Sequence, residues 1–204
     1  MVESARSLQH FRENFLKLLH TEWLIWLVLV MAVGLRLWQL DSPGERYFDE
    51  VYHVPAAQLM SRGDWSAFEW WHPPVDGSNY FDWLHPPLAK YTQAFSIWVG
   101  REVFNSESAF WWRLPSAVFG VGTVWLVMAM VQRLGSLVLR DKPDAEKMAK
   151  NVLYGAAFAG MIAATDGLLL VQSRIAMNDA LLCFLLSLVR RLVLRAKSLP
   201  TMSV

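Results

Sequence analysis

Apolar runs with the length of membrane-spanning helices alternate with polar segments along this chain. A helix needs about 20 mostly apolar residues to cross the hydrocarbon core of a bilayer. Three runs reach or approach that length and a fourth is shorter; they are residues 23–40, 114–131, 152–171 and 180–189. The pattern predicts an all-α polytopic membrane protein with about four transmembrane helices.

A further apolar segment, residues 88–104, contains Lys90 and Arg101, and the basic residues elsewhere decide how it lies. Lys and Arg are enriched on the cytoplasmic side of membrane proteins. They cluster before the first predicted span, at residues 140–150, and after the last span. All three clusters share one side of the membrane only if residues 88–104 do not cross it. We therefore expect this segment to be an amphipathic juxtamembrane helix on the outer surface.

This topology divides the chain into three parts. Residues 1–22 form a cytoplasmic N-terminal segment, and residues 190–204 form a cytoplasmic tail. Residues 23–189 form a membrane module with a large external loop at 41–113. The hydrophobic content of 54% and the mean hydropathy of +0.26 agree with this division, because they suit several spans joined by a sizeable polar loop.

The composition and the motifs that are missing exclude several classes of function. There is no phosphate-binding glycine loop, no zinc-ligand spacing and no Gly-x-Ser-x-Gly motif. No basic surface interleaved with aromatic residues indicates a nucleic-acid partner. Cys183 is the single cysteine, so an internal disulfide is excluded. We assign no cofactor; a divalent metal is compatible with the chemistry below but is not required for it.

Two adjacent carboxylates, Asp49 and Glu50, follow the first predicted span by only a few residues. A partly desolvated carboxylate at a membrane surface can act as a general base toward a hydroxyl group, or as a metal ligand. The alternative is structural, because Asp49 or Asp41 could simply cap a helix that runs on through residues 54–57. The residues alone leave both interpretations open.

The segment His85-Pro86-Pro87-Leu88-Ala89-Lys90 predicts a rigid turn that leads into a helix. The first proline restricts His85 to extended conformations, and the second suits the first turn of a helix. Such a rigid turn could direct His85 and Lys90 toward an anionic group. The alternative is an ordinary helix start with exposed charges.

Two arginines lie at the predicted outer ends of spans. Arg113 precedes the second span and could bind a lipid phosphate through two parallel hydrogen bonds, or could act as an interfacial anchor. Arg174 and Asp179 lie in the external turn between the third and fourth spans. Their structural alternative is an exposed ion pair within the turn, which would contribute little.

Together these motifs resemble those of the protein O-mannosyltransferases, the dolichyl-phosphate-mannose–protein mannosyltransferase family of GT-C membrane glycosyltransferases. The resemblance covers roughly residues 23–189, and five motifs occur in the order of the family. They are Arg36-Leu37-Trp38-Gln39-Leu40, Phe48-Asp49-Glu50, His85-Pro86-Pro87-Leu88-Ala89-Lys90, Arg113-Leu114-Pro115-Ser116-Ala117-Val118-Phe119-Gly120 and Ser173-Arg174-Ile175-Ala176-Met177-Asn178-Asp179.

The resemblance implies transfer of mannose, with inversion, from a polyprenyl-phosphate donor to Ser or Thr hydroxyls of proteins. It implies that Asp49 is the catalytic base and that Glu50 is its acidic companion. It also implies a set of residues that bind the substrate or the lipid phosphate: Arg113, His85, Lys90, Arg174 and Asp179. An acceptor hydroxyl needs a base within hydrogen-bond reach, and a departing phosphate needs fixed positive charge.

Family members are much longer, so the resemblance concerns their N-terminal part. It implies a fragment or one piece of a split enzyme, with membrane lipids and a C-terminal half or homologous subunit as further partners. The implied localisation is a multi-pass membrane protein, in the plasma membrane of a prokaryote or the endoplasmic reticulum of a eukaryote. Two alternatives stay open: a related GT-C transferase that moves another sugar to a lipid or glycan, and a non-catalytic membrane subunit.

Overall fold

A computed structural model describes residues 22–46, 48–68, 85, 87–139, 142 and 144–196. Every regular element in these ranges is helical, which confirms the prediction of an all-α protein. A first helix covers residues 22–37. The elements that follow are α2 (Glu50–Ser61), the 3₁₀ helix η1 (Trp65–Phe68), α3 (Leu88–Phe104), α4 (Ala109–Leu139), α5 (Ala145–Thr165), α6 (Gly167–Gln172) and α7 (Asn178–Ala196).

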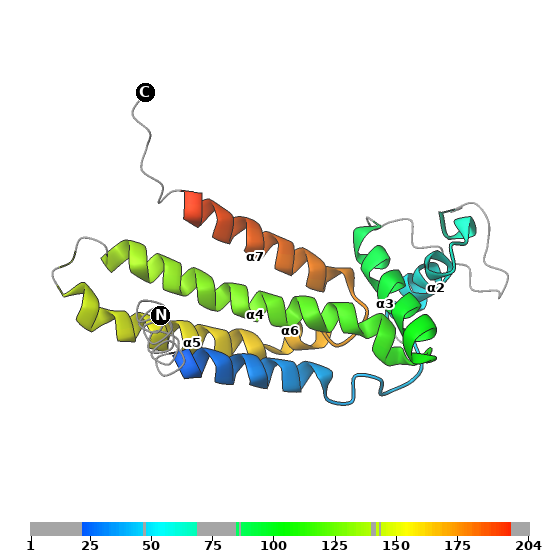
Figure 1. The fold of residues 1–204 in the computed structure, drawn as a ribbon, viewed down its shortest axis with the longest axis horizontal. Coiled ribbons are helices and arrows are strands. Elements are labelled where there is room, and N and C mark those ends of the chain that lie inside the picture. Colours follow the sequence, from blue (N-terminus) through cyan, green and yellow to red (C-terminus); the bar gives the residue numbers. More distant parts are fainter. Residues whose placement is uncertain are drawn as a thin grey trace, which may run out of the picture.

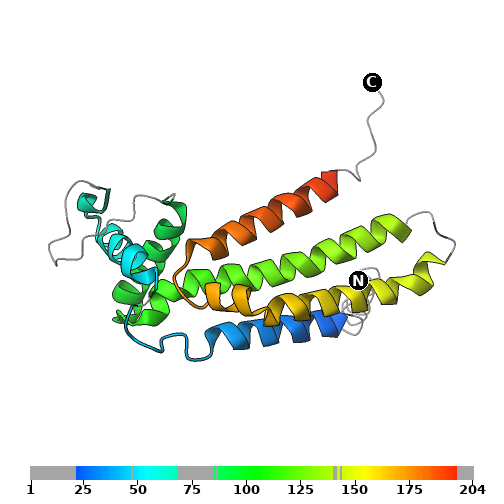
Figure 2. The same cartoon turned by 180° about the vertical axis from the view of Figure 1, so that it is seen from behind.

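The helices form a long bundle with a small cap at one end (Figures 1 and 2). The first helix, α4 and α5 run side by side, and α7 packs against α4 but diverges from it toward the C-terminal end of α7. The cap contains α2, η1 and α3, with α3 crossing the end of the bundle. This arrangement places the polar motifs of the sequence at the junction between the cap and the bundle.

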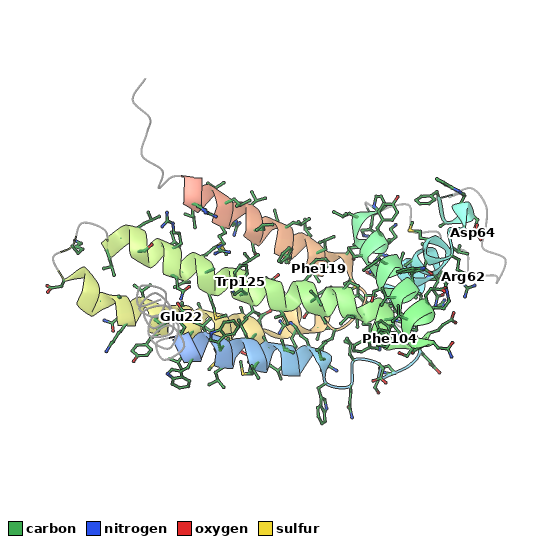
Figure 3. All side chains as sticks on the ribbon, in the orientation of Figure 1. Glu22, Arg62, Asp64, Phe104, Phe119 and Trp125 are labelled. Atoms are coloured by element: carbon green, nitrogen blue, oxygen red, sulfur yellow. The ribbon has the colours of Figure 1, made fainter. Side chains whose placement is uncertain are left out.

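Small residues allow the bundle helices to approach one another closely, as is common where helices pack inside membranes. The buried residues that join the first helix, α4 and α5 are Ile25, Val28, Ala32, Val124, Met128, Ala156, Ala157 and Ala164. Many large apolar side chains on the same helices point outward instead, among them Val118 on α4 and Phe158 on α5. Figure 3 shows Trp125 projecting from the middle of α4, with 42% of its surface exposed. Such outward apolar surface suits a lipid environment.

In the described part of the chain, α4 is the one helix that is long and apolar enough to cross a membrane, judged by length and composition alone. It contains the predicted span at residues 114–131 and extends beyond it at both ends. The other three spans stay predictions.

The third predicted span, residues 152–171, is not one continuous helix. α5 ends at Thr165, and Asp166 adopts an extended conformation (φ −57°, ψ 122°). The Asp166 carboxylate then accepts a hydrogen bond of 2.8 Å from the backbone N–H of Leu169 and so caps α6. A hydropathy pattern does not reveal this break, because the run is apolar on both sides of Asp166. That residues 152–171 cross a membrane stays a prediction.

Arg36 lies in the last turn of the first helix and points into the bundle. Its side chain is fully buried in the bundle, where Nη1 makes long contacts of 3.4 Å with the carbonyls of Ala32 and Ala164. The carbonyl of Ala164 belongs to the last turn of α5, where carbonyl groups lack intrahelical partners and attract a cation.

The helix predicted for residues 88–104 is confirmed, with bounds at Leu88 and Phe104. It ends at Asn105, whose left-handed backbone (φ 48°) lets its N–H bond the carbonyl of Gly100. One face of α3 is buried against its neighbours, and Gly100 on that face lies directly under the ring of Trp111. The expectation that α3 lies on the outer surface of a membrane stays a prediction.

Candidate active site

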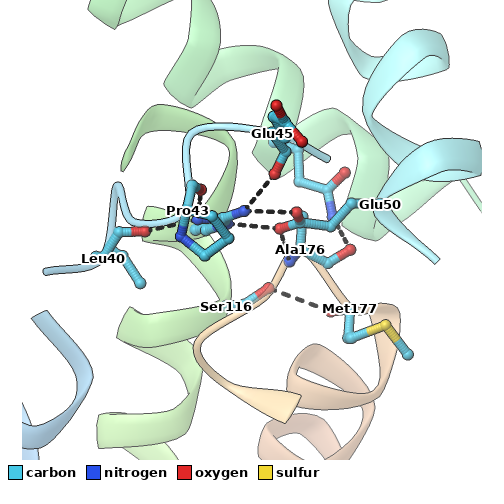
Figure 4. A network of polar contacts seen from close by, with 9 residues as sticks. Leu40, Pro43, Glu45, Glu50, Ser116, Ala176 and Met177 are labelled. Atoms are coloured by element: carbon cyan, nitrogen blue, oxygen red, sulfur yellow. Dashed lines mark hydrogen bonds and ion pairs between the residues drawn. The ribbon is translucent and has the colours of Figure 1, made fainter. Parts of the chain in front are cut away.

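Glu50 and Arg113 form the centre of the site, although they are 63 residues apart in the sequence. Glu50 is the first residue of α2, and Arg113 lies in the second turn of α4. Arg113 Nε donates to Glu50 Oε1 at 2.7 Å, and Nη2 donates to Oε2 at 2.8 Å (Figure 4). Their side chains are 0% and 1% exposed, so this two-pronged ion pair is screened from solvent.

The remaining N–H groups of Arg113 bind the backbone of the turn that follows the first helix. Nη1 donates to the carbonyls of Leu40 (3.1 Å) and Pro43 (2.7 Å), and Nη2 donates to that of Glu45 (3.0 Å). A guanidinium group has five N–H donors, and here all five are engaged within the protein. Arg113 is therefore not an exposed interfacial anchor, which removes that alternative.

Asp49 lies next to this ion pair but in a different environment. Phe48 has a left-handed backbone (φ 55°), which for a bulky residue costs about 1–3 kcal/mol and marks a constrained turn. Asp49 occupies the N-cap position of α2, yet no side-chain capping bond forms there. Within the described residues its partly exposed carboxylate makes no hydrogen bond or ion pair. The capping alternative is thus not realised through the side chain.

The turn between α6 and α7 contacts the same carboxylate. The backbone N–H of Ala176 donates to Glu50 Oε1 at 3.0 Å (Figure 4). Arg174 turns away from this contact, because its two Nη atoms donate at 2.8 Å to the carbonyls of Leu35 and Trp38, at the end of the first helix. The alternative of an ion pair between Arg174 and Asp179 is therefore wrong.

Two histidines and a lysine lie on α2, just before α3 and on α3. His53, one helical turn after Asp49, is 1% exposed, and its ring meets that of His85 edge to face at a centroid distance of 5.1 Å. Its Nε2 also lies 3.4 Å from Nδ2 of Asn178, at the start of α7. Lys90 is 3% exposed on α3. The structure thus joins His85 to the site through His53, which sequence reasoning missed.

Asp179, like Arg174, is a predicted site residue that does not contact the carboxylate pair. It is exposed and lines a separate cavity of about 550 Å³ between α4, α6 and α7, together with Asp166 and Gln172. Among the described residues, no group of three or more His, Cys, Asp or Glu side chains could hold a metal ion.

The apolar helix α4 and the polar site at its end fit the class of membrane glycosyltransferases that the motifs indicate. The chain is 30% identical over 169 residues to a protein of Corynebacterium glutamicum named polyprenol-phosphate-mannose–protein mannosyltransferase. It is 29% identical over 162 residues to proteins of the same name in two strains of Mycobacterium tuberculosis. These alignments cover 79% of this chain, and the family indicated by its motifs is confirmed: the chain is a relative of the protein mannosyltransferases.

The chain spans only about a quarter of the length of these curated relatives: 27% of the Corynebacterium protein and 26% of the Mycobacterium proteins. No family model matches it, and no solved structure matches it.

Proposed function

We propose that this chain is part of a membrane glycosyltransferase that moves mannose from a polyprenyl-phosphate donor to Ser or Thr hydroxyls of proteins, with inversion. One observation carries the proposal: four of the five motifs, through Leu40, Glu50, Arg113 and Ala176, meet around the buried Glu50–Arg113 pair and leave Asp49 accessible beside it. The names of the relatives support the donor and the protein acceptor.

Asp49 is the base in this proposal. Its carboxylate is partly exposed and accepts no bond within the described residues, so it can receive a proton from an acceptor hydroxyl. The hydroxyl oxygen attacks the anomeric carbon as its proton passes to Asp49. The bond from that carbon to the phosphate oxygen breaks, and the lipid phosphate leaves with the electron pair. Attack opposite the leaving group inverts the configuration.

Glu50 does not act as a second base. It holds the start of α2, and thereby Asp49, in place. Arg113 neutralises its charge, and the N–H of Ala176 occupies Oε1 as well. Arg113 itself could bind a donor phosphate only by breaking one of its five hydrogen bonds within the protein. We therefore assign Arg113 to holding Glu50 and the turn at residues 40–45. Lys90 then supplies positive charge for the departing phosphate, and His85 can donate a hydrogen bond to it.

The membrane arrangement follows from the same proposal. The segments 1–22 and 190–204 are cytoplasmic, and the loop 41–113 is external in a multi-pass protein. The site then lies at the outer surface, where a lipid-linked donor and a protein acceptor can meet. Arg174 fastens the turn before α7 to the first helix, while Asp179 lines the neighbouring cavity.

The proposal is tested by sugar transfer in vesicles. The purified chain receives a polyprenyl-phosphate mannose labelled in the sugar and a peptide rich in Ser and Thr. In parallel, a chimera of the Corynebacterium relative carries this chain in place of the matching region. We expect labelled peptide in at least one preparation, with an anomeric configuration opposite to that of the donor. Retention of configuration, or no transfer by either protein, would overturn the proposal.

A further inference from the structure

The turn at residues 174–178 accepts contacts from side chains of three helices. Its own Arg174 contacts a fourth helix. α2 contacts it through Glu50 and His53, α3 through Gln93, and α4 through Ser116. Arg174 extends from the turn to the end of the first helix. Residues 174–177 of this segment lack regular structure, and Asn178 begins α7. The segment is thus one of the points where the cap and the bundle are joined.

Gln93 makes the contact from α3. Its side chain is 1% exposed, and Nε2 donates to the carbonyl of Ala176 at 3.2 Å. Among the described residues its Oε1 has no hydrogen-bond partner. A buried amide that is only half satisfied is costly, and an apolar side chain of similar size would avoid that cost. A polar side chain at this position is therefore explained by its hydrogen bond to Ala176 and not by its packing.

Ser116 makes the matching contact from α4. Its Oγ is buried and donates at 3.2 Å to the carbonyl of Met177, the residue after Ala176 (Figure 4). A tight bond of 2.7 Å from the N–H of Met177 to the carbonyl of Ile175 closes the turn. With the carbonyls of Ala176 and Met177 both held, the N–H of Ala176 stays directed at Glu50.

We propose that Gln93 and Ser116 are positioning residues for the carboxylate pair. Their bonds fix the backbone of residues 176 and 177. The N–H of Ala176 then orients Oε1 of Glu50 through its hydrogen bond. Because Glu50 is the first residue of α2, this bond also fixes the start of the helix, where Asp49 is the N-cap residue. The effect on catalysis rests on the function proposed above. The effect on the turn does not, so the two can be separated by experiment.

The test is hydrogen exchange of the full chain in lipid nanodiscs, resolved to single amides by fragmentation. Gln93→Leu and Ser116→Ala each remove one bond to the turn. Thr92→Val is the matched control, because among the described residues Thr92 Oγ1 bonds only the carbonyl of Ala89, within α3. We expect Gln93→Leu and Ser116→Ala to speed exchange at Ala176 by about 2- to 10-fold, the range for one lost hydrogen bond. Thr92→Val should leave Ala176 unchanged.

Unchanged exchange at Ala176 in both variants, or equal acceleration in Thr92→Val, would overturn the inference. Ser116→Ala is conservative enough to fold if Gln93→Leu does not. Where transfer is measurable, both variants should lower kcat and leave the donor KM unchanged. A wild-type protein without transfer would count against the proposed function and leave the exchange result standing.

Discussion

Glu50 and Arg113 are joined by two hydrogen bonds of 2.7 and 2.8 Å in a site that excludes solvent. Burying two charges is costly, and the cost is offset only when the geometry is good and further bonds satisfy the remaining groups. Here three backbone carbonyls accept the remaining hydrogen bonds of the guanidinium group, and the N–H of Ala176 donates a further hydrogen bond to the carboxylate. The pair therefore fixes the relative position of α2, α4 and the turn before α7.

Glu50→Gln should lower the stability of the protein. Gln cannot neutralise Arg113, and breaking a buried ion pair by changing one partner costs about 3–5 kcal/mol. Thermal unfolding in detergent, followed by circular dichroism, measures the loss. Glu45→Gln is the matched control, because the Glu45 side chain is exposed and only its carbonyl binds Arg113. Equal unfolding temperatures for the two variants would contradict the role given to Glu50.

Arg113→Lys separates positioning from phosphate binding. Lys cannot reproduce the planar fork or all five donors, so the turn at residues 40–45 should loosen and the unfolding temperature should fall. If Arg113 acts through position, kcat should fall with little change in the donor KM. Arg46→Lys, at an exposed arginine in the same loop, is the control. Unaltered stability with a raised donor KM would instead assign Arg113 to the phosphate.

The helices could be predicted from the sequence largely because apolar periodicity and turn residues agree locally. For α3, two prolines precede Leu88 and Asn105 caps the end, so both bounds were predictable. The last helix was predicted to end near residue 189 but continues to Ala196, because the arginines that follow favour helix nearly as well as apolar residues do.

The contacts within the site could not be predicted in the same way. The motifs placed Asp49, Glu50 and Arg113 on neighbouring segments, but which carboxylate pairs with the arginine depends on how α2 and α4 cross. His53 lies outside the Phe48-Asp49-Glu50 motif that matches the family, so the resemblance gave it no role. Its four-residue spacing from Asp49, which puts both on one side of a helix, was the one signal available.

Gly120→Ala tests the close approach of three segments in the bundle. An added Cβ would lie 2.3 Å from Cβ of Ser173 and 2.7 Å from Nε of Arg36. Overpacking of this kind costs about 1–3 kcal/mol. Gly155→Ala is the matched control, because no atom lies within 4 Å of its added Cβ. There the greater helix propensity of Ala should stabilise the protein by up to about 1 kcal/mol. A higher unfolding temperature for Gly120→Ala than for Gly155→Ala would contradict the close packing around Gly120.

The predicted topology can be checked by cysteine labelling in intact cells, in a background with Cys183→Ser. A cysteine at exposed Asn105 should react with an impermeant thiol reagent from outside, and so should one at Asp76, which lies outside the described residues. A cysteine at Lys142 should react only after the cells are opened. Protection of position 105 together with external labelling of position 142 would show that residues 88–104 cross the membrane.

Asp49→Asn is the decisive variant for the proposed chemistry. Asn has nearly the same size and caps helices about as well as Asp, but it cannot take a proton from the acceptor hydroxyl. General-base catalysis typically contributes about 10²–10⁴-fold, so we expect transfer to fall by that factor while expression, membrane insertion and unfolding temperature stay normal. Asp41→Asn, at an exposed acid in the turn at residues 40–45, should keep full activity. Near-normal transfer by Asp49→Asn would remove the assignment of the base and leave only the relationship to the mannosyltransferases.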